Sequence, residues 1–399
     1  MTKLDELIQE LCPDGVKYKA LGEICKLVTG ATPSKTNAAY WENGTIPWMS
    51  SGEVNLKRVA ATEKKITQLG YEKNSTTIVP KHSVVIALAG QGKTRGKVAI
   101  TEIELCTNQS LCSMICNENL DYKFLYYILD GKYKELRAIS NGDGTRGGLS
   151  LKILAPYKIP VPPLPVQREI VRILDNFTEL TAELTAELTA ELTARKKQYE
   201  FYRDKLLTFG DVQGGATSDV VWKTLGEVCK ISAGGDAPKD SMSKQKTEKY
   251  SVPIISNGIG ENALYGYTDA PKVEEPAVTV AARGTIGYAE YRDYPFYPII
   301  RLLTAIPKDS TIVNTKYLYY CLQGKQYSVP MGGIPQLTAP ELKKVEIPIP
   351  SLDVQNRIVQ VLDNFDAICT DLSSGLPAEI EARQKQYEYY RDKLLEFEK

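Results

Sequence analysis

Apolar residues recur at helical spacing in two places where the chain has nearly the same sequence. The first copy is "VQREIVRILDNF" (166–177) and the second is "VQNRIVQVLDNF" (354–365). A proline-rich lead-in, such as "IPVPPLP" (159–165), precedes the helix and favours an extended entry. Each copy therefore predicts a helix with one buried face. In the first copy that face consists of Val166, Ile170, Ile173, Leu174 and Phe177.

The first helix is predicted to continue through residues 178–207, a further stretch of roughly 45 Å. It contains the tetrad Thr-Ala-Glu-Leu three times and so places a row of leucines along one side. The second helix carries a similar row, but "SSGLP" (373–377) predicts a kink or an interruption there. We expect the two helices to pack antiparallel through these rows. The rows are Leu180, Leu184, Leu188 and Leu192, and Ile368, Leu372, Leu376 and Ile380.

The segments between the helical regions differ strongly from each other but share a strand pattern. "SVVIALA" (83–89) and "PAVTVAA" (276–282) predict buried strands, each followed by a glycine-containing turn. The fold class expected is α+β, with two α/β lobes related by an approximate twofold axis. Two long antiparallel helices, forming a coiled coil, separate the lobes.

Four segments follow from this pattern. Residues 1–157 form the first lobe, including an N-terminal helix at 2–12 that we expect beside the end of the second helical region. Residues 158–214 form the central helical region with its tetrad spacer. Residues 215–345 form the second lobe, and residues 346–399 the C-terminal helical region.

The composition is that of a globular protein, with 43% hydrophobic and 25% charged residues among 399. No apolar run approaches the ~20 residues of a membrane span. The start carries no signal-peptide pattern and the eight cysteines form no CxxC pair, so we expect a cytoplasmic protein that binds no membrane. The net charge is zero, but residues 1–158 have a basic excess and residues 347–399 an acidic one. Local basic patches are what attract phosphate.

Signs of catalysis are missing from the sequence. His82 is the one histidine, which argues against a catalytic triad or a two-histidine zinc site. "ALAGQGKT" (87–94) resembles a phosphate-binding loop, but it runs into another strand-like stretch instead of a helix. We interpret it as a strand–turn–strand unit. The prediction is a chain that is no enzyme and holds no metal or cofactor.

Together these residues resemble the specificity subunit of type I restriction–modification enzymes. The resemblance rests on the repeated helical segments and on matching pieces of the lobes, and the tetrad run resembles one subgroup of that family. The lobe pieces are "GATPSKTNAAYWENGTIPWMSSGEV" (30–54), "YSVPIISNGIGENALYGYT" (250–268) and "RGTIGYAEY" (283–291).

The resemblance implies a division of labour. Each lobe would be a target recognition domain that reads half of a bipartite double-stranded DNA sequence. The helices would set the spacing of the half-sites and dock two methyltransferase (modification) subunits. S-adenosylmethionine, ATP and magnesium would bind to partner subunits, and restriction/translocase subunits would join the full complex.

Cationic side chains of the lobes are the candidate DNA contacts, because Arg and Lys bind guanine edges and phosphates. We assign Trp41, Trp48 and Trp222 to the core, not to base stacking. The first-lobe candidates are Lys35, Lys57, Arg58, Lys93, Arg95, Lys97 and Arg146. The second-lobe candidates are Lys239, Lys244, Arg283, Arg292 and Arg301.

Two other functions stay open from the residues alone. One is a DNA methyltransferase or nuclease with split recognition, which would need a catalytic or cofactor constellation. The other is a coiled-coil adaptor that binds only protein, which leaves two divergent lobes on a duplicated frame unexplained.

Overall fold

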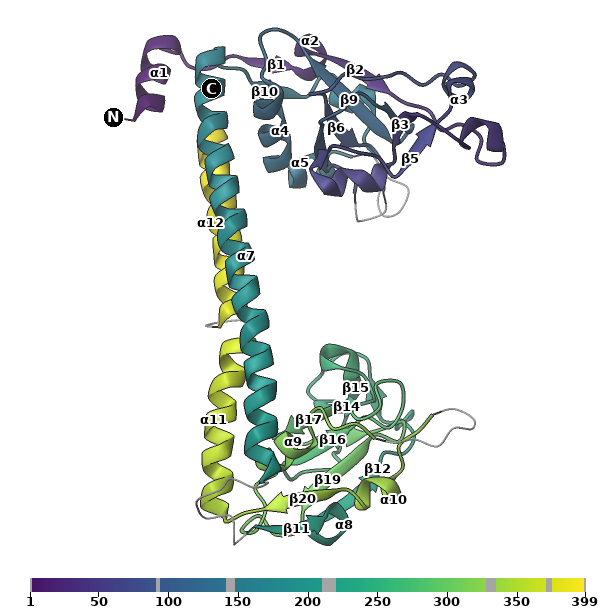
Figure 1. Ribbon diagram of the computed structural model, residues 1–399, viewed down its shortest axis with the longest axis vertical. Helices are drawn as coiled ribbons and strands as arrows, with labels where there is room; N and C mark the ends of the chain where they lie inside the picture. The colour runs from purple at the N-terminus through teal and green to yellow at the C-terminus, as the bar shows by residue number, and fades with distance from the viewer. Residues whose placement is uncertain are drawn as a thin grey trace. The chain divides into compact units, whose positions relative to one another are not determined.

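The computed structural model describes residues 2–90, 94–140, 148–209, 220–327, 335–370 and 375–397 (Figure 1). The chain divides into two compact units. The first unit joins Met1–Glu187 to Ile380–Lys399, and the second is Leu188–Glu379. Each unit thus contains one lobe and a part of both helical regions, so the C-terminal helical region is shared between the units.

The first lobe is built on two sheets. The larger sheet has the strand order β2–β9–β6–β7–β4, and its central strands β6 and β7 are buried at every position. The smaller sheet has the order β5–β3–β8. The larger sheet consists of β2 (Cys25–Thr29), β4 (Arg58–Val59), β6 (Val84–Ala87), β7 (Val98–Thr101) and β9 (Leu111–Cys116). The smaller consists of β3 (Ile46–Met49), β5 (Lys64–Ile66) and β8 (Cys106–Thr107).

Short helices and one strand pair complete the first lobe. Asp121 caps the N-terminus of α4 by accepting hydrogen bonds from Lys123 and Phe124, and the apolar face of α4 is buried. The strand pair β1–β10 is antiparallel. These elements are α2 (Leu21–Ile24), η1 (Ala38–Tyr40), η2 (Ser51–Leu56), α3 (Gln68–Glu72), α4 (Tyr122–Gly131), α5 (Tyr133–Ala138), α6 (Leu151–Leu154), β1 (Tyr18–Ala20) and β10 (Lys158–Pro160).

The second lobe repeats most of this topology: it has no described equivalent of β4, and its smaller sheet has one additional strand, β13. Its larger sheet has the order β12–β19–β16–β17, and its smaller sheet has the order β13–β15–β14–β18. The parallel pair β14–β18 corresponds to the parallel pair β3–β8. The strands are β11 (Val221–Thr224), β12 (Cys229–Ala233), β13 (Met242–Ser243), β14 (Val252–Ile255), β15 (Leu264–Thr268), β16 (Ala277–Val280), β17 (Ala289–Arg292), β18 (Tyr297–Pro298), β19 (Leu303–Pro307) and β20 (Glu346–Ile349). The short helices are α8 (Leu225–Val228), η4 (Gly260–Ala263), α9 (Thr315–Leu322) and α10 (Ala339–Lys343).

The long helix α7 (Leu164–Thr208) has 45 residues and passes through the whole tetrad repeat without a break. In the C-terminal region, α11 (Leu352–Thr370) ends before α12 (Leu376–Leu395) begins. This agrees with the predicted interruption, although Ser373 and Ser374 lie outside the described residues. Pro377 falls in the first turn of α12, where its missing N–H costs no helical hydrogen bond.

Within each unit the helices pair antiparallel. In the first unit, α12 lies against the start of α7, where Phe177 stacks on Tyr390 with ring centroids 6.0 Å apart. In the second unit, α11 lies against the end of α7, and Tyr202 stacks on Phe365 at 5.9 Å. Leu4 of the helix α1 (Lys3–Leu11) is part of the hydrophobic core of the first lobe. Leu395 and Phe397, near the end of the chain, pack against the same core. The N-terminal helix and the end of the chain therefore border the same core, while their direct docking stays a prediction.

The leucine row of α7 is not uniformly packed. Leu188 is buried, Leu184 and Leu192 are half-buried, and Leu180 is exposed. A tetrad advances the helix by about 400°, so successive leucines drift around it by about 40°. Side chains spaced four residues apart therefore drift away from a fixed buried face within a few repeats. Leu180 accordingly lies outside the buried face that contains Leu188.

The matching row in the C-terminal region is also only partly buried. Ile368 is exposed because its neighbour Cys369 occupies the buried face of α11, together with Ile358 and Leu362. Leu376 and Ile380 are half-buried, and Leu372 lies outside the described residues.

The stretch that resembles a phosphate-binding loop joins two paired strands. β6 and β7 are antiparallel, with Ile86 opposite Val98. This confirms the strand–turn–strand interpretation, and of the turn itself Gln91, Gly92 and Lys93 lie outside the described residues.

Candidate nucleic-acid interface

Three of the predicted cations of the first lobe gather around η2. Lys57 ends this helix with a φ of +61° and is exposed. Arg58 follows it at the start of β4, and the Lys97 ammonium donates a hydrogen bond to Asn55 Oδ1 at 2.7 Å. Their clustering makes a local positive patch, which is the kind of surface that phosphate groups bind.

The other first-lobe candidates are dispersed. Arg95 is half-buried, and its Nε has no hydrogen-bond partner within the described part of the chain. Lys35 is exposed and lines a separate cleft. Lys93 and Arg146 lie outside the described residues.

That cleft, of about 820 Å³, lies beside the smaller sheet of the first lobe. Near its lining residues Thr32 and Asn108, the chain at Gly30 approaches β8 so closely that a Cβ atom there would come within 1.7 Å of the Thr107 carbonyl oxygen. The next loop is held by indole N–H groups: Trp48 donates to the Ala31 carbonyl at 2.9 Å and Trp41 to the Ser34 carbonyl at 3.0 Å. The remaining lining includes Lys35, Lys64, Lys65, Glu63, Asn108 and Gln109.

In the second lobe, two candidates make contacts within the lobe. Lys244 lies 3.6 Å from the ring centroid of Tyr265 and donates to its carbonyl oxygen at 2.9 Å. Arg283 donates two hydrogen bonds to Gln336 Oε1, at 3.0 and 2.6 Å. Lys239 and Arg301 are exposed, and Arg301 has a φ of +60°.

Arg292 occupies a different environment from the other candidates. It is 3% exposed, and its guanidinium bonds the Thr279 hydroxyl, the Tyr294 hydroxyl and the Glu290 carboxylate. A buried guanidinium whose donors are used inside the lobe stabilises packing, so we leave Arg292 out of the interface proposed below. The assignment of tryptophans to the core holds for Trp48, but it is wrong for Trp222, which is 50% exposed.

A polar junction ties the first lobe to the start of α7. Gln167 is fully buried and makes three hydrogen bonds. Its Oε1 accepts from the Asp121 N–H at 2.8 Å, while its Nε2 donates to the carbonyls of Asn119 and Pro162 at 2.9 and 2.7 Å. One side chain thus satisfies backbone groups at the N-terminus of α4 and at the proline-rich entry to α7.

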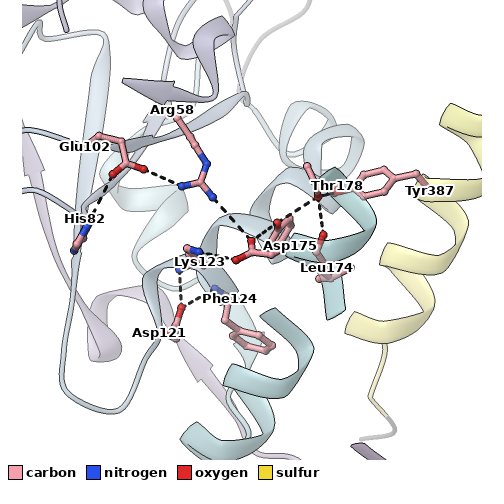
Figure 2. Close-up of polar contacts among 11 residues, drawn as sticks. Arg58, His82, Glu102, Asp121, Lys123, Phe124, Leu174, Asp175, Thr178 and Tyr387 are labelled. Atoms are coloured by element: carbon pink, nitrogen blue, oxygen red, sulfur yellow. Dashed lines mark hydrogen bonds and ion pairs between the residues drawn. The ribbon is translucent and has the colours of Figure 1, made fainter. Parts of the chain in front are cut away.

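Figure 2 shows the adjoining charge network, centred on Asp175 of α7. Asp175 accepts from Lys123 at 2.6 Å and from the Tyr127 hydroxyl at 2.7 Å. Burial raises the pKa of Tyr127, which keeps its hydroxyl protonated as a donor. The Arg58 guanidinium lies 3.9 Å from Asp175 and 2.9 Å from Glu102, so it connects β4 to the helix and its charge is partly neutralised by these two carboxylates.

The same junction is present in the second unit. Gln355 accepts from the Asn314 N–H at 2.9 Å and donates to the carbonyls of Ile312 and Pro350 at 2.8 and 2.9 Å. Lys316 donates to Asp363 at 2.8 Å, and the Tyr320 hydroxyl also donates to Asp363. Sequence reasoning missed these residues, although each glutamine lies inside a repeated segment and is retained in both copies.

Two other kinds of feature are absent from the part of the chain that the structure describes. Within the described ranges, no group of three or more His, Cys, Asp or Glu side chains is arranged to hold a metal ion. None of the helices described is both long and apolar enough to cross a membrane.

The family to which the chain belongs follows from its sequence match. A family model described as "Type I restriction modification DNA specificity domain" matches residues 13–194 and 217–382, which include most of both lobes and of both helical regions. The chain therefore belongs to the family of type I restriction–modification DNA specificity domains.

Two named relatives are similar over most of the chain. The type I restriction enzyme EcoR124I/EcoR124II specificity subunit of Escherichia coli is 30% identical over 430 residues, covering 100% of this chain and 98% of the relative. The putative type I specificity subunit S.MpnORF89P of Mycoplasma pneumoniae (strain ATCC 29342 / M129 / Subtype 1) is 39% identical over 289 residues, covering 70% of this chain and 83% of the relative.

Solved structures share the fold. A chain described under "complex assembly and conformational transition of the type I R-M system" matches with a TM-score of 0.73 and 17% identity, covering 96% of this chain and 98% of that one. The HsdS subunit from Thermoanaerobacter tengcongensis matches with a TM-score of 0.56 and 19% identity, covering 96% and 97%. The expected fold, mixed helix and sheet with two repeated lobes and a long helix, is confirmed.

Proposed function

We propose that this chain is the DNA-recognition subunit of a type I restriction–modification complex and that each lobe reads one half of a bipartite target. The observation that carries the proposal is the duplication of the frame. Two lobes of largely the same topology are held by equivalent junctions, Gln167 with Asp175 and Gln355 with Asp363, whereas their outer loops differ. Two readers on one frame suit a target made of two different half-sites.

Charge supports double-stranded DNA as the ligand. Lys57, Arg58 and Lys97 form one patch, and Lys35, Lys64 and Lys65 line the cleft of the same lobe. Phosphate contacts of this kind position a protein on a duplex, while contacts to base edges supply specificity. A protein-only adaptor would not require either feature.

Exposed rings on the helices support two methyltransferase subunits as partners. Phe201 of α7 is 61% exposed, and Tyr389, its counterpart on α12, is 62% exposed. Each ring packs edge-on against the next residue, Tyr202 or Tyr390, with centroids 5.4 and 5.3 Å apart. Exposed aromatic anchors are typical of protein interfaces, and an anchor present once in each unit fits a partner that binds twice.

The chemistry belongs to the partners in this proposal. The methyltransferase subunits bind S-adenosylmethionine and methylate adenine, and restriction/translocase subunits use ATP and magnesium. The complex acts in the cytoplasm. The present chain contributes recognition and spacing and is itself non-catalytic.

Methyl-transfer assays with labelled S-adenosylmethionine test the proposal. Duplex DNA is incubated with the chain alone, with the methyltransferase subunit alone, and with both together. The mixture should methylate a bipartite sequence, and neither component alone should do so. Methyl transfer by the purified chain, at stoichiometric amounts, would refute the division of labour and favour the split-recognition enzyme.

A further inference from the structure

Two turns occupy the same position in the two lobes. The β8–β9 turn (108–110) and the β18–β19 turn (299–302) both follow the strand that pairs in parallel with a central strand of the smaller sheet. The Asn108 N–H donates to the Met49 carbonyl at 3.1 Å, and the Ile299 N–H donates to the Ile255 carbonyl at 2.9 Å. The two turns are therefore equivalent elements of a duplicated fold.

The exposed tips of the turns carry different chemistry. The first lobe presents Gln109, an amide with both a donor and an acceptor, and the second presents Ile300 and Arg301. Frame residues such as Gln167 and Gln355 are retained between the lobes. A difference at equivalent exposed tips is therefore what two readers of different half-sites require.

Gln109 is held in place at a positive cleft. The Thr32 hydroxyl donates to its Oε1, which orients the amide plane. Three lysines of the cleft lining, Lys35, Lys64 and Lys65, outnumber the carboxylate of Glu63. A fixed amide beside lysines combines a group that recognises base edges with groups that bind the phosphate backbone.

The second turn is strained. Ile300 and Arg301 have φ values of +53° and +60°, in the left-handed region that β-branched residues rarely adopt. The Asn257 side chain donates to the Ile300 carbonyl at 2.6 Å and supports the turn. Backbone strain of this kind clusters at ligand-binding sites, and here it holds the backbone of an exposed arginine at the tip.

We propose that these two turns read the bases, with Gln109 recognising an adenine in one half-site and Arg301 a guanine in the other. In the major groove an amide side chain pairs with N6 and N7 of adenine, and a guanidinium pairs with O6 and N7 of guanine. Lys64 and Lys65 contact the phosphates beside the first turn. The inference rests on the proposed function, because it takes duplex DNA as the ligand.

The experiment uses the full chain in complex with its methyltransferase subunits and pools of duplexes in which half-site positions are varied one at a time. Q109L should lose a preference for adenine at one position, and R301Q a preference for guanine at one position of the other half-site. Each loss should be roughly 10- to 100-fold, since a bidentate base contact supplies about 1–3 kcal/mol of discrimination. R301K keeps the positive charge but loses the pair of guanidinium N–H donors that can bond O6 and N7 together, so it should also lose the guanine preference.

Lys64→Ala is the matched control for a phosphate contact. It should weaken binding to all sequences alike, reduce the slope of log affinity against log salt by about one, and leave the methylated motif unchanged. Melting curves of the complexes verify that each variant is folded.

An unchanged motif in Q109L and R301Q would overturn the proposal. So would an equal loss of binding to all sequences at an unchanged melting temperature, because that is the behaviour of a phosphate contact. Changes that fall in the same half-site for both variants would also overturn it. Failure of the wild-type complex to methylate any bipartite sequence would instead contradict the proposed function.

Discussion

The lobe–helix junctions of the first and second units are built from the same residue types, but the first junction has an additional charged residue. Both use a buried glutamine, and both pair a lysine and a tyrosine with an aspartate, Asp175 or Asp363. The first junction adds Arg58 from β4. The larger sheet described in the second lobe has four strands, and none corresponds to β4. The frame is therefore retained, while its link to the outer surface of the lobe has diverged.

The opposite ends of the helices show a second difference. Arg391 of α12 bonds Asp130, at the end of α4, at 2.7 Å. Its counterpart Arg203 on α7 has no such partner in α9 among the contacts described. Both arginines pair with the next residue, Asp392 or Asp204, and both lie against a glycine at the end of a lobe helix, Gly131 or Gly324. Equivalent arginines thus lie at equivalent helix ends, but of the two, among the contacts described, only Arg391 forms an ion pair with another element, α4. We expect substitutions in the shared frame to lower the stability of both units equally. Substitutions that remove the additional contacts of Arg58 or Arg391 should affect the two units unequally.

The largest effect is expected from the buried glutamines. Gln167→Leu removes the partner of two carbonyls and one N–H, and one of these three hydrogen bonds is buried while two are part-buried. A buried polar group left without a partner costs about 1–3 kcal/mol, and a part-buried one costs less. We predict a loss of roughly 4 kcal/mol in the free energy of unfolding, and an equal loss for Gln355→Leu. Denaturant unfolding of both variants measures this. Losses that differ by more than about 2 kcal/mol would show that the junctions are not energetically equivalent.

Replacing the arginines should lower the stability of the two units by different amounts. Arg391→Ala leaves the partly buried Asp130 without its cation, and removal of one member of a buried pair costs several kcal/mol, less where the partner is partly exposed. We predict a loss of about 2 kcal/mol for Arg391→Ala and less than half of that for Arg203→Ala. Thermal unfolding monitored by circular dichroism makes the comparison. An equal loss in both variants would mean that the ion pair with Asp130 adds nothing to the shared packing.

The exposed rings provide a symmetrical test. Phe201→Ala and Tyr389→Ala should each weaken one methyltransferase binding site by roughly tenfold, the lower range for an interface anchor. Mass measurements of the complex at limiting concentrations should then show one bound copy instead of two for each variant. Two bound copies in both variants would place the docking surface elsewhere. Tyr202→Phe, which removes only the hydroxyl of the neighbouring ring, is a matched control and should leave both copies bound.

The smallest predicted change concerns the continuous helix α7, in contrast to the divided pair α11 and α12. Deleting residues 185–188 removes one tetrad, about 6 Å of helix with a net turn near 40°. A DNA base pair turns by roughly 34–36°. We predict that both half-sites persist and that the optimal gap between them shortens by about one base pair.

Duplexes that differ only in gap length serve as substrates for this test. The control deletes residues 185–187, which rotates the rest of the helix by about 60° in the opposite sense and should abolish methylation at every gap. An unchanged optimum in the four-residue deletion would deprive the repeat of its role as a spacer.

Much of the frame could be predicted from the sequence because its signals are local and occur twice. The apolar spacing around Ile170 and Leu174 predicts α7, and the glycine and proline near 375–377 predict the division between α11 and α12. The failures also have local causes. A leucine row of period four drifts off the buried face, which leaves Leu180 exposed, and the charge of Arg292 did not reveal that a polar pocket inside the lobe encloses it.

The cleft and the equivalent turns could not be found in this way. Gln109 lies at the cleft because β3 pairs with β8, and this pairing joins residues almost sixty positions apart. Gln167 looks like an ordinary surface residue of an amphipathic helix until the N-terminus of α4 is placed beside it. Such sites depend on long-range pairing, which no periodicity of a single segment encodes.

The central claim is that the two lobes read their half-sites independently on a common frame. Exchanging residues 15–157 for the corresponding lobe of a relative, and sequencing the methylated sites of cells that carry the complete system, tests it most directly. We predict that one half of the methylated motif changes while the other half persists. If both halves change together, or if neither does, the lobes are not independent readers and the account is contradicted.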